Sequence, residues 1–264
     1  MSDLPITASR PLRLSAWTIV AFLVLPVTVV VPISLTDHRY LSLPTERLSG
    51  EHFANLFTSA AWLSSIGQSF VIAIVSTAIA LVVGTLCAIG CWRVSPRIGN
   101  AVRALMLLPI MIPTIIYALG LYRFWIDLRL LDTYTGVVIA HAVTAIPYIV
   151  ITVSTSLAGF DPRLEQAARS LGATVPQTLG RVIVPSILPG ILSGGIFAFV
   201  HSWDELVIVL FIASRAIFTL PRRMWDGINE HLDPTMAAVA VVLVAVSTSL
   251  LLLDLKVRTR RARA

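Results

Sequence analysis

The decapeptide Leu164-Glu165-Gln166-Ala167-Ala168-Arg169-Ser170-Leu171-Gly172-Ala173 is a polar break in a chain that is otherwise largely apolar. Alanine, leucine, glutamate, glutamine and arginine are strong helix formers, so the segment is predicted to be helical. The runs on both sides of it are hydrophobic enough to lie in lipid. A polar helix held between two such runs lies at the membrane surface, where another molecule can contact it. The organisation of the chain can therefore be worked out from this break.

The composition is that of a membrane protein. Of 264 residues, 56% are hydrophobic and 13% are charged, and the mean hydropathy is +0.86. Soluble domains carry about 25% charged residues. Several runs approach the roughly 20 apolar residues that cross a bilayer as a helix. The sequence therefore predicts an all-α membrane protein with one transmembrane domain over residues 1–264.

Six apolar segments are predicted to span the membrane. The first begins near Ala16 and is interpreted as an uncleaved span, because it is long and has no small-x-small cleavage site. Prolines inside the segments are tolerated where neighbouring helices satisfy the freed backbone groups. An even number of spans places both termini on the same side. The predicted spans are 16–36, 66–90, 103–124, 135–156, 187–212 and 235–253.

The positive charges indicate which side that is. With both termini inside, thirteen of the 20 lysines and arginines lie on the inner side, as the positive-inside rule requires. The tails, about 1–15 and 254–264, and the loop 157–186 are then cytoplasmic. The basic C-terminal tail is interpreted as an anchor on anionic lipid. The basic residues have no interleaved aromatic residues, which excludes a nucleic-acid-binding protein.

The loop 157–186 carries the signals of a short capped helix. Asp161 followed by Pro162 is a typical helix start, and Gly172 suits the left-handed position after a helix end. Thr174 is expected to cap a second helix that leads into the fifth span. Between these caps one apolar face is expected, which fits a protein groove or, alternatively, the surface of the inner leaflet. The residues of this face are Leu164, Ala167, Ala168 and Leu171.

This loop resembles the EAA loop of the inner-membrane permeases of binding-protein-dependent ABC importers. The matching residues, in order and spacing, are Gln166-Ala167-Ala168, Leu171-Gly172-Ala173, Pro185 and Leu188-Pro189-Gly190. The family's glutamate position is Gln166 here, and Glu165 precedes it, so a charge pairing with the ATPase is in doubt. The resemblance implies the type I importer permease fold with a coupling helix between spans four and five. Its ATPase-coupling residues would be Leu164, Glu165, Gln166, Ala167, Ala168, Leu171 and Gly172.

The resemblance also implies partners and a location. Such a permease works in the bacterial inner membrane with a second permease subunit, a dimer of ATPase subunits and an extracytoplasmic solute-binding protein. The chain itself lacks an ATP-binding P-loop, which needs a lysine after glycine, because its only lysine is Lys256. It is therefore predicted to be a transport subunit and not an enzyme, with no cofactor and no metal of its own.

Three further stretches are similar to the polyamine-type members of this family. They are His141 with Pro147-Tyr148, then Ser202-Trp203-Asp204-Glu205, and the outer run from Thr219-Leu220-Pro221 to Met224-Trp225-Asp226-Gly227-Ile228. This similarity implies uptake of a polyamine such as putrescine or spermidine.

Asp204 and Glu205 are the strongest candidates for a substrate path. A carboxylate near the bilayer centre costs about 2.5–3.5 kcal/mol, so it normally faces a bundle interior or a wet cavity. On a continuous helix, at about 100° per residue, both acids share one sector with His201 and Ser202. Trp203 then points away and packs or, alternatively, makes a cation–π contact. In the fourth span Tyr148 belongs to a polar stripe that either joins helices or lines the path.

Other functions remain open from the sequence. The acids could form an internal ion pair or be protonated, and the cargo could be another amine or an amino-acid derivative. A proton-coupled secondary transporter would use Asp204 and Glu205 as proton carriers, but no internal repeat of that class is found. An intramembrane enzyme would need a nucleophile–base pair or a metal constellation, and no HExxH-type spacing is present.

Overall fold

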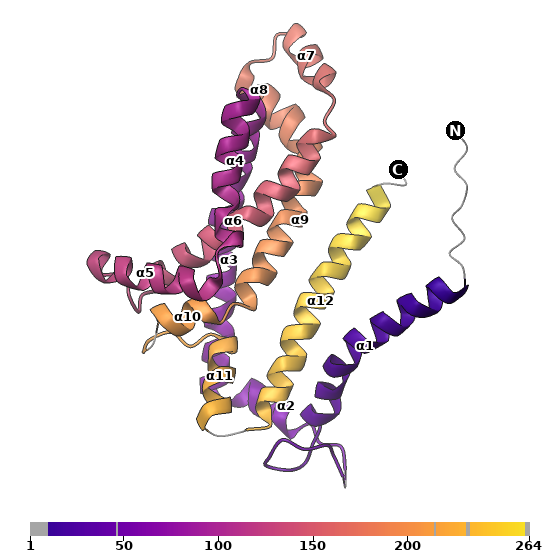
Figure 1. Cartoon of the computed structure of the whole chain (residues 1–264), viewed down its shortest axis with the longest axis vertical. Coiled ribbons are helices and arrows are strands. Elements are labelled where there is room, and N and C mark those ends of the chain that lie inside the picture. Colours follow the sequence, from indigo (N-terminus) through magenta and orange to yellow (C-terminus); the bar gives the residue numbers. More distant parts are fainter. Residues whose placement is uncertain (1–9, 46, 214, 231–232, 262–264) are drawn as a thin grey trace. The chain divides into compact units, whose positions relative to one another are not determined.

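The computed structural model describes residues 10–45, 47–213, 215–230 and 233–261, and these are helical over most of their length (Figure 1). The ends of both predicted tails, 1–9 and 262–264, lie outside the described residues. The chain divides into two compact units, Met1–Ser59 with Asp226–Val242, and Ala60–Trp225 with Leu243–Ala264. The elements are α1 (Arg10–Ser34), α2 (Glu51–Thr58), α3 (Ala60–Arg93), α4 (Pro96–Met111), α5 (Thr114–Leu128), α6 (Tyr134–Ala158), α7 (Pro162–Ser170), α8 (Val175–Thr178), the π-helical turn η1 (Leu179–Ile183), α9 (Val184–Trp203), α10 (Val207–Ile212), α11 (Leu220–Glu230) and α12 (Thr235–Arg261).

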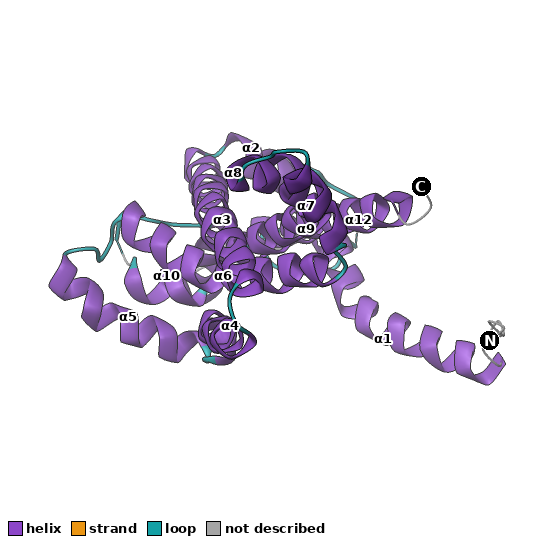
Figure 2. Ribbon diagram, turned by 90° about the horizontal axis from the view of Figure 1, so that it is seen from above, coloured by secondary structure: helices purple, strands orange, loops and turns teal. Residues whose placement is uncertain are grey.

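Three helices, α3, α6 and α9, form the core of the larger unit, and Figure 2 shows them bundled together. Small residues line their contacts, so the backbones approach closely, as is common between membrane helices. Gly190 and Gly194 of α9 lie directly against Thr152 and Ile149 of α6, respectively. The buried cluster around this crossing contains Ala80, Ala88, Ala145, Ile149, Val153, Ile183, Ile187 and Ala198.

The contacts define the direction of these helices. Gly84 of α3 abuts Ile149 of α6, and Trp92 meets Phe160 with ring centroids 5.8 Å apart. Residue numbers rise together along both helices, so α3 and α6 run parallel. Between the end of α3 and the start of α6 the chain must therefore return through α4 and α5.

That return is bent, so the predicted span 103–124 is not one straight helix. Helix α4 ends at Met111 and α5 begins at Thr114, and the two axes differ by 100°. The cause is Pro113, which has no N–H and forces Ile112 out of the helical region, to ψ 127°. Five helices are long and apolar enough to cross a membrane, or up to six if the bent pair is one span.

The predicted span 187–212 is also not one helix. A helical run begins earlier, at Val175, passes through η1 and ends at Trp203. Asp204, Glu205 and Leu206 separate it from α10. The Glu205 Oε1 atom accepts a hydrogen bond of 3.1 Å from the Ile208 N–H and so caps the start of the new helix. Acidic side chains that bond nearby backbone groups compete with helix continuation in this way. The π-helical turn holds one more residue per turn than an α-helix.

The other four predicted spans, 16–36, 66–90, 135–156 and 235–253, fall on the long helices α1, α3, α6 and α12. Pro26, Pro32 and Pro147 lie inside α1 and α6 without ending them. In the smaller unit α1 has an apolar surface that is exposed along most of its length. Asn55 of α2 donates a hydrogen bond of 2.9 Å to Thr235 at the start of α12.

Candidate functional site

The predicted helix in the polar break is confirmed as α7, and its start has the expected cap. Asp161 adopts an extended conformation, and its Oδ1 atom accepts a hydrogen bond of 2.9 Å from the Arg163 N–H. Pro162 occupies the first turn, where its missing N–H has no cost. The cap and the proline therefore set where α7 begins. Thr174 begins the second predicted helix, α8, with its N–H donating to Gln177 Oε1 at 2.9 Å.

The end of α7 is equally well defined. Gly172 has a φ of +86°, which glycine adopts without strain. Its N–H donates to the Arg169 carbonyl at 3.0 Å, and the Ala173 N–H donates to the Ala168 carbonyl at 3.1 Å. This pair of bonds is a Schellman motif. It closes the helix without help from any other element, so α7 is a short, self-capped unit.

The apolar face of α7 is uncovered. None of the residues of α7 is buried, and Leu164 and Leu171 are 51% and 90% exposed. A leucine as exposed as Leu171, next to a polar helix, leaves apolar area that a partner surface could cover.

Glu165 does not project outward with that face. Its Oε1 atom accepts a hydrogen bond of 3.0 Å from Arg93 Nη1 at the end of α3. This ion pair was not predicted, because the two residues are 72 positions apart and lie in different elements. Gln166, at the family's glutamate position, is exposed instead.

Ser202 and Trp203 lie inside the helical bundle. Both side chains are 4% exposed. The Ser202 Oγ atom is 2.8 Å from His141 Nδ1 and 3.0 Å from Ser76 Oγ, so it joins α9 to α6 and α3. Trp203 stacks on Phe199 with ring centroids 5.9 Å apart. Because the helix ends at Trp203, the predicted sector of Ser202 with Asp204 and Glu205 does not form.

His201 and Tyr148 form a second group between α9 and α6. The His201 Nε2 atom is 3.0 Å from Thr144 Oγ1. Its ring lies beside Tyr148 with centroids 5.1 Å apart. The polar stripe of α6 thus joins helices at His141 and Thr144, and it presents a partly exposed phenol at Tyr148.

The two predicted acids lie at the break after α9. Asp204 is exposed, and its Oδ2 atom accepts a hydrogen bond of 3.1 Å from Ser247 of α12. Glu205 is half-buried and caps α10 as described above. The sequences of α6, α9 and α10 contain no lysine or arginine. The carboxylate of Asp204 can therefore attract a cation from outside these helices.

A third carboxylate, Asp254, was not predicted. It is buried on α12 and accepts a hydrogen bond from Ser193 of α9. The predicted span ended at 253, which placed this residue in the tail. Ser193 also borders a cavity of about 310 Å³ between α6 and α9, whose polar lining includes Thr152, Thr155 and Ser156.

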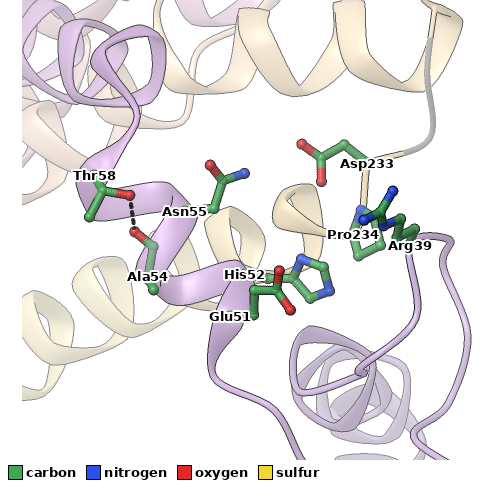
Figure 3. A pocket seen from close by; sticks show the side chains of 8 residues that line it. All are labelled: Arg39, Glu51, His52, Ala54, Asn55, Thr58, Asp233 and Pro234. Carbon is green, nitrogen blue, oxygen red and sulfur yellow. Dashed lines mark hydrogen bonds between the residues drawn. The ribbon is translucent and has the colours of Figure 1, made fainter.

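The smaller unit holds a separate polar pocket of about 720 Å³ (Figure 3). Its wall comes from α2, from Arg39, and from Asp233 and Pro234, which precede α12. Its charged lining is mixed: Arg39 is basic, and Glu51 and Asp233 are acidic. None of the predicted site residues lines it. Within the described residues no three His, Cys, Asp or Glu side chains converge as metal ligands would.

Sequence comparison identifies a family over most of the chain. Residues 80–262 match the model of the binding-protein-dependent transport system inner membrane component. The spermidine/putrescine transport system permease protein PotC of Haemophilus influenzae is 28% identical over 224 residues, covering 85% of this chain and 87% of PotC. The putrescine transport system permease protein PotI of Escherichia coli K12 is 26% identical, covering 91% and 88%. The trehalose transport system permease protein SugB of Mycobacterium tuberculosis is 27% identical, covering 84% and 83%.

Solved structures have the same fold. A bacterial ABC transporter that imports the acidic polysaccharide alginate matches with a TM-score of 0.69 at 16% identity, covering 92% of this chain and 94% of that chain. The MetNI methionine ABC transporter, in inward-facing conformations, matches with a TM-score of 0.63 at 19% identity, covering 76% and 96%. At these identities the likeness establishes the fold, and the cargo has to be argued from the site.

Proposed function

Because the chain belongs to the family of binding-protein-dependent transport system inner membrane components, we propose that it is the permease of an ATP-driven polyamine importer. The family makes it a multi-pass inner-membrane transport subunit and not an enzyme. The polyamine cargo is supported by the names of PotC and PotI. The observation that carries it is Asp204, an exposed carboxylate that follows α9, where the sequences of α6, α9 and α10 contain no lysine or arginine. SugB, at a comparable identity, keeps an importer of another solute as the alternative.

The substrate path is proposed to follow Asp204, Glu205, Tyr148 and His201. A polyamine presents several ammonium groups, each of which can be bound by a carboxylate or lie against an aromatic ring. Asp204 and Tyr148 would contact the cargo, and His201 would orient the Tyr148 ring. Ser202 and Trp203 would hold the end of α9 in place from the core side, Ser202 through its bonds to His141 and Ser76.

The chain is proposed to cross the membrane six times as one permease domain, with the bent pair α4–α5 as the third crossing and both termini in the cytoplasm. The positive-inside count supports this orientation, and a reporter fused after Ala264 would give a cytoplasmic signal. The Arg93 end of α3 and the helix α7 are then cytoplasmic. Pro162–Ser170 with Leu171 and Gly172 would dock in an ATPase dimer. A second permease would complete the pore, and a binding protein would deliver cargo from outside.

The proposed transport cycle follows from the position of α7 between the ATPase dimer and α9. Closure of the ATPase pair on ATP would move α7, because α7 is self-capped and moves as a unit. The motion would pass through α8 and η1 into α9, which ends at the Asp204 break. The path would then change from outward- to inward-open. Ligands and ATP act here by binding one of two conformations more tightly than the other.

The function is tested by reconstituting the full complex in liposomes with its binding protein. We expect ATP hydrolysis and solute uptake to rise with putrescine or spermidine and not with a monoamine or a neutral sugar. Stimulation by a neutral or anionic solute would keep the importer and contradict the polyamine cargo. Uptake driven by a proton gradient without the ATPase would contradict the importer itself.

The docking role of α7 is tested at Gly172. A φ of +86° costs about 1–2 kcal/mol for a residue with a side chain, so Gly172→Val is expected to distort the end of α7. We expect ATP-driven uptake to fall about 5- to 30-fold, the equivalent of that energy. Gly120→Val in α5 is the control, because an added Cβ there meets nothing within 4 Å and the φ is not positive. Normal uptake by Gly172→Val would contradict the assignment of α7 as the docking helix.

A further inference from the structure

We propose that the Arg93–Glu165 ion pair makes α3 a second route by which movement of α7 reaches the Asp204 end of the bundle. This inference rests on the proposed function, in which the ATPase moves α7. The first route is the chain itself, through α8 and η1 into α9. The second route requires a contact between α7 and a helix that is remote from it in sequence.

The contact with α3 is made by two consecutive residues. Arg93 Nη1 donates to Glu165 Oε1 at 3.0 Å, and the two side chains are 33% and 14% exposed. The preceding residue, Trp92, packs edge-on against Phe160, which lies just before α7. The Arg93 guanidinium also lies 5.4 Å from the centroid of the Trp92 ring, which restricts its position. The end of α3 thus holds both the turn into α7 and α7 itself.

The remaining attachments of α7 are weak. No residue of α7 is buried, and the elements that approach it most are α8 and η1, which follow it in the chain. A helix with so few contacts would rotate or tilt about its ends when the ATPase moves it. The charge pair adds a fixed point in its first turn, and pairs that are partly shielded from water are screened less by salt than exposed ones.

Helix α3 can carry a displacement to the far side of the bundle. It is 34 residues long and contains no proline. Ser76 lies 17 residues before Arg93, which corresponds to about 25 Å along the helix axis. Ser76 Oγ donates to Ser202 Oγ at 3.0 Å, and Ser202 is two residues before Asp204. A shift of α3 at Arg93 is therefore transmitted to the end of α9 through a buried hydrogen bond.

The test compares single charge variants with the charge swap in the reconstituted complex. We expect Arg93→Gln and Glu165→Gln each to lower the polyamine moved per ATP hydrolysed by about 2- to 30-fold, the range of coupling effects along such networks. ATP hydrolysis itself is expected to continue. The double variant Arg93→Glu with Glu165→Arg is expected to recover most of the loss, because the pair is restored in reverse. Arg97→Gln removes an exposed cation four residues after Arg93. It is expected to change the amount of polyamine moved per ATP hydrolysed by less than about twofold.

Each outcome separates this inference from the proposed function. Single variants with the wild-type ratio would overturn the inference and leave the importer intact. A swap that recovers nothing would also overturn it, because the two residues would then act apart. If a glutamine variant fails to assemble, Glu165→Asp keeps the charge and shortens the side chain, and an unchanged ratio would count against the inference. A wild-type complex without ATP-driven uptake would instead contradict the proposed function.

Discussion

Replacing Asp204 by asparagine is expected to lower ATP-driven polyamine uptake by about 10- to 100-fold while the complex still assembles. A hydrogen bond to a charged group contributes about 1.5–3 kcal/mol, and each 1.4 kcal/mol corresponds to a factor of ten. Asparagine has the same shape and can still accept from Ser247, so the bond between α9 and α12 is retained. The measurement is the initial rate of labelled putrescine or spermidine uptake into proteoliposomes, together with the ATP hydrolysis that the solute stimulates.

The control is Asp127→Asn, the same chemical change at an exposed carboxylate near the end of α5. The uptake rate of this variant is expected to stay within about twofold of the wild-type rate, since exposed charges contribute little to local interactions. If Asp204→Asn transports polyamines at the wild-type rate, Asp204 does not line the path. If a neutral solute stimulates ATP hydrolysis by the wild type, and stimulates Asp204→Asn equally, the cargo is not a polycation.

Replacing Gly190 by valine is expected to destabilise the permease by about 3 kcal/mol or more. A Cβ at Gly190 would lie 2.2 Å from Ser156 Oγ and 2.7 Å from the Thr152 carbonyl oxygen. The Ser156 side chain could turn away, but the carbonyl belongs to the backbone of α6 and cannot move alone. Forcing extra atoms into a packed contact typically costs 1–3 kcal/mol, occasionally more, and valine adds two methyl groups beyond the Cβ.

The measurement is the thermal unfolding of the detergent-solubilised complex and the yield of permease in the membrane. Gly67→Val is the matched control, because Gly67 also lies within a long helix and a Cβ there meets nothing within 4 Å. We expect its melting temperature to stay close to that of the wild type. Equal melting temperatures for the two variants would show that α6 and α9 do not cross at Gly190 as described.

Local signals in the sequence were sufficient to predict α7 and both of its ends. Asp161, Pro162 and Gly172 act on the backbone within a few residues, so cap and turn chemistry predicts both ends of the helix. The spans on α1, α3, α6 and α12 follow from hydropathy for a similar reason, since the cost of lipid contact depends on composition. The family assignment made from this loop is confirmed by the match over residues 80–262.

The two broken spans could not be predicted from composition. Pro147 and Pro113 look alike in the sequence, yet α6 continues through Pro147 and the chain bends by 100° around Pro113. Whether a proline ends a membrane helix depends on which groups surround it. The break at Asp204 arises because Glu205 caps a new helix, and periodicity treats both acids simply as polar positions. Ser202 was therefore assigned to a sector with Asp204 and Glu205 that is not formed.

The remaining features depend on contacts between distant parts of the chain. Arg93 and Glu165 have no sequence relation that predicts a pair. The buried Asp254 was assigned to the tail because the predicted span ended one residue too early. Arg93 and Asp254 are charged residues close to the ends of predicted spans, and in a membrane protein such a charge is usually attributed to topology.

The π-helical turn Leu179–Ile183 makes the chain sensitive to changes of length at one place. One residue more or fewer in a helix rotates everything beyond it by about 100° and shifts it by about 1.5 Å. Loss of a single codon in this turn would leave α9 intact and yet redirect Leu164 and Leu171 to a different side of the bundle. Homologous permeases could thus diverge in the angle at which they present α7 by insertion or deletion within one turn, without any change in the docking residues themselves.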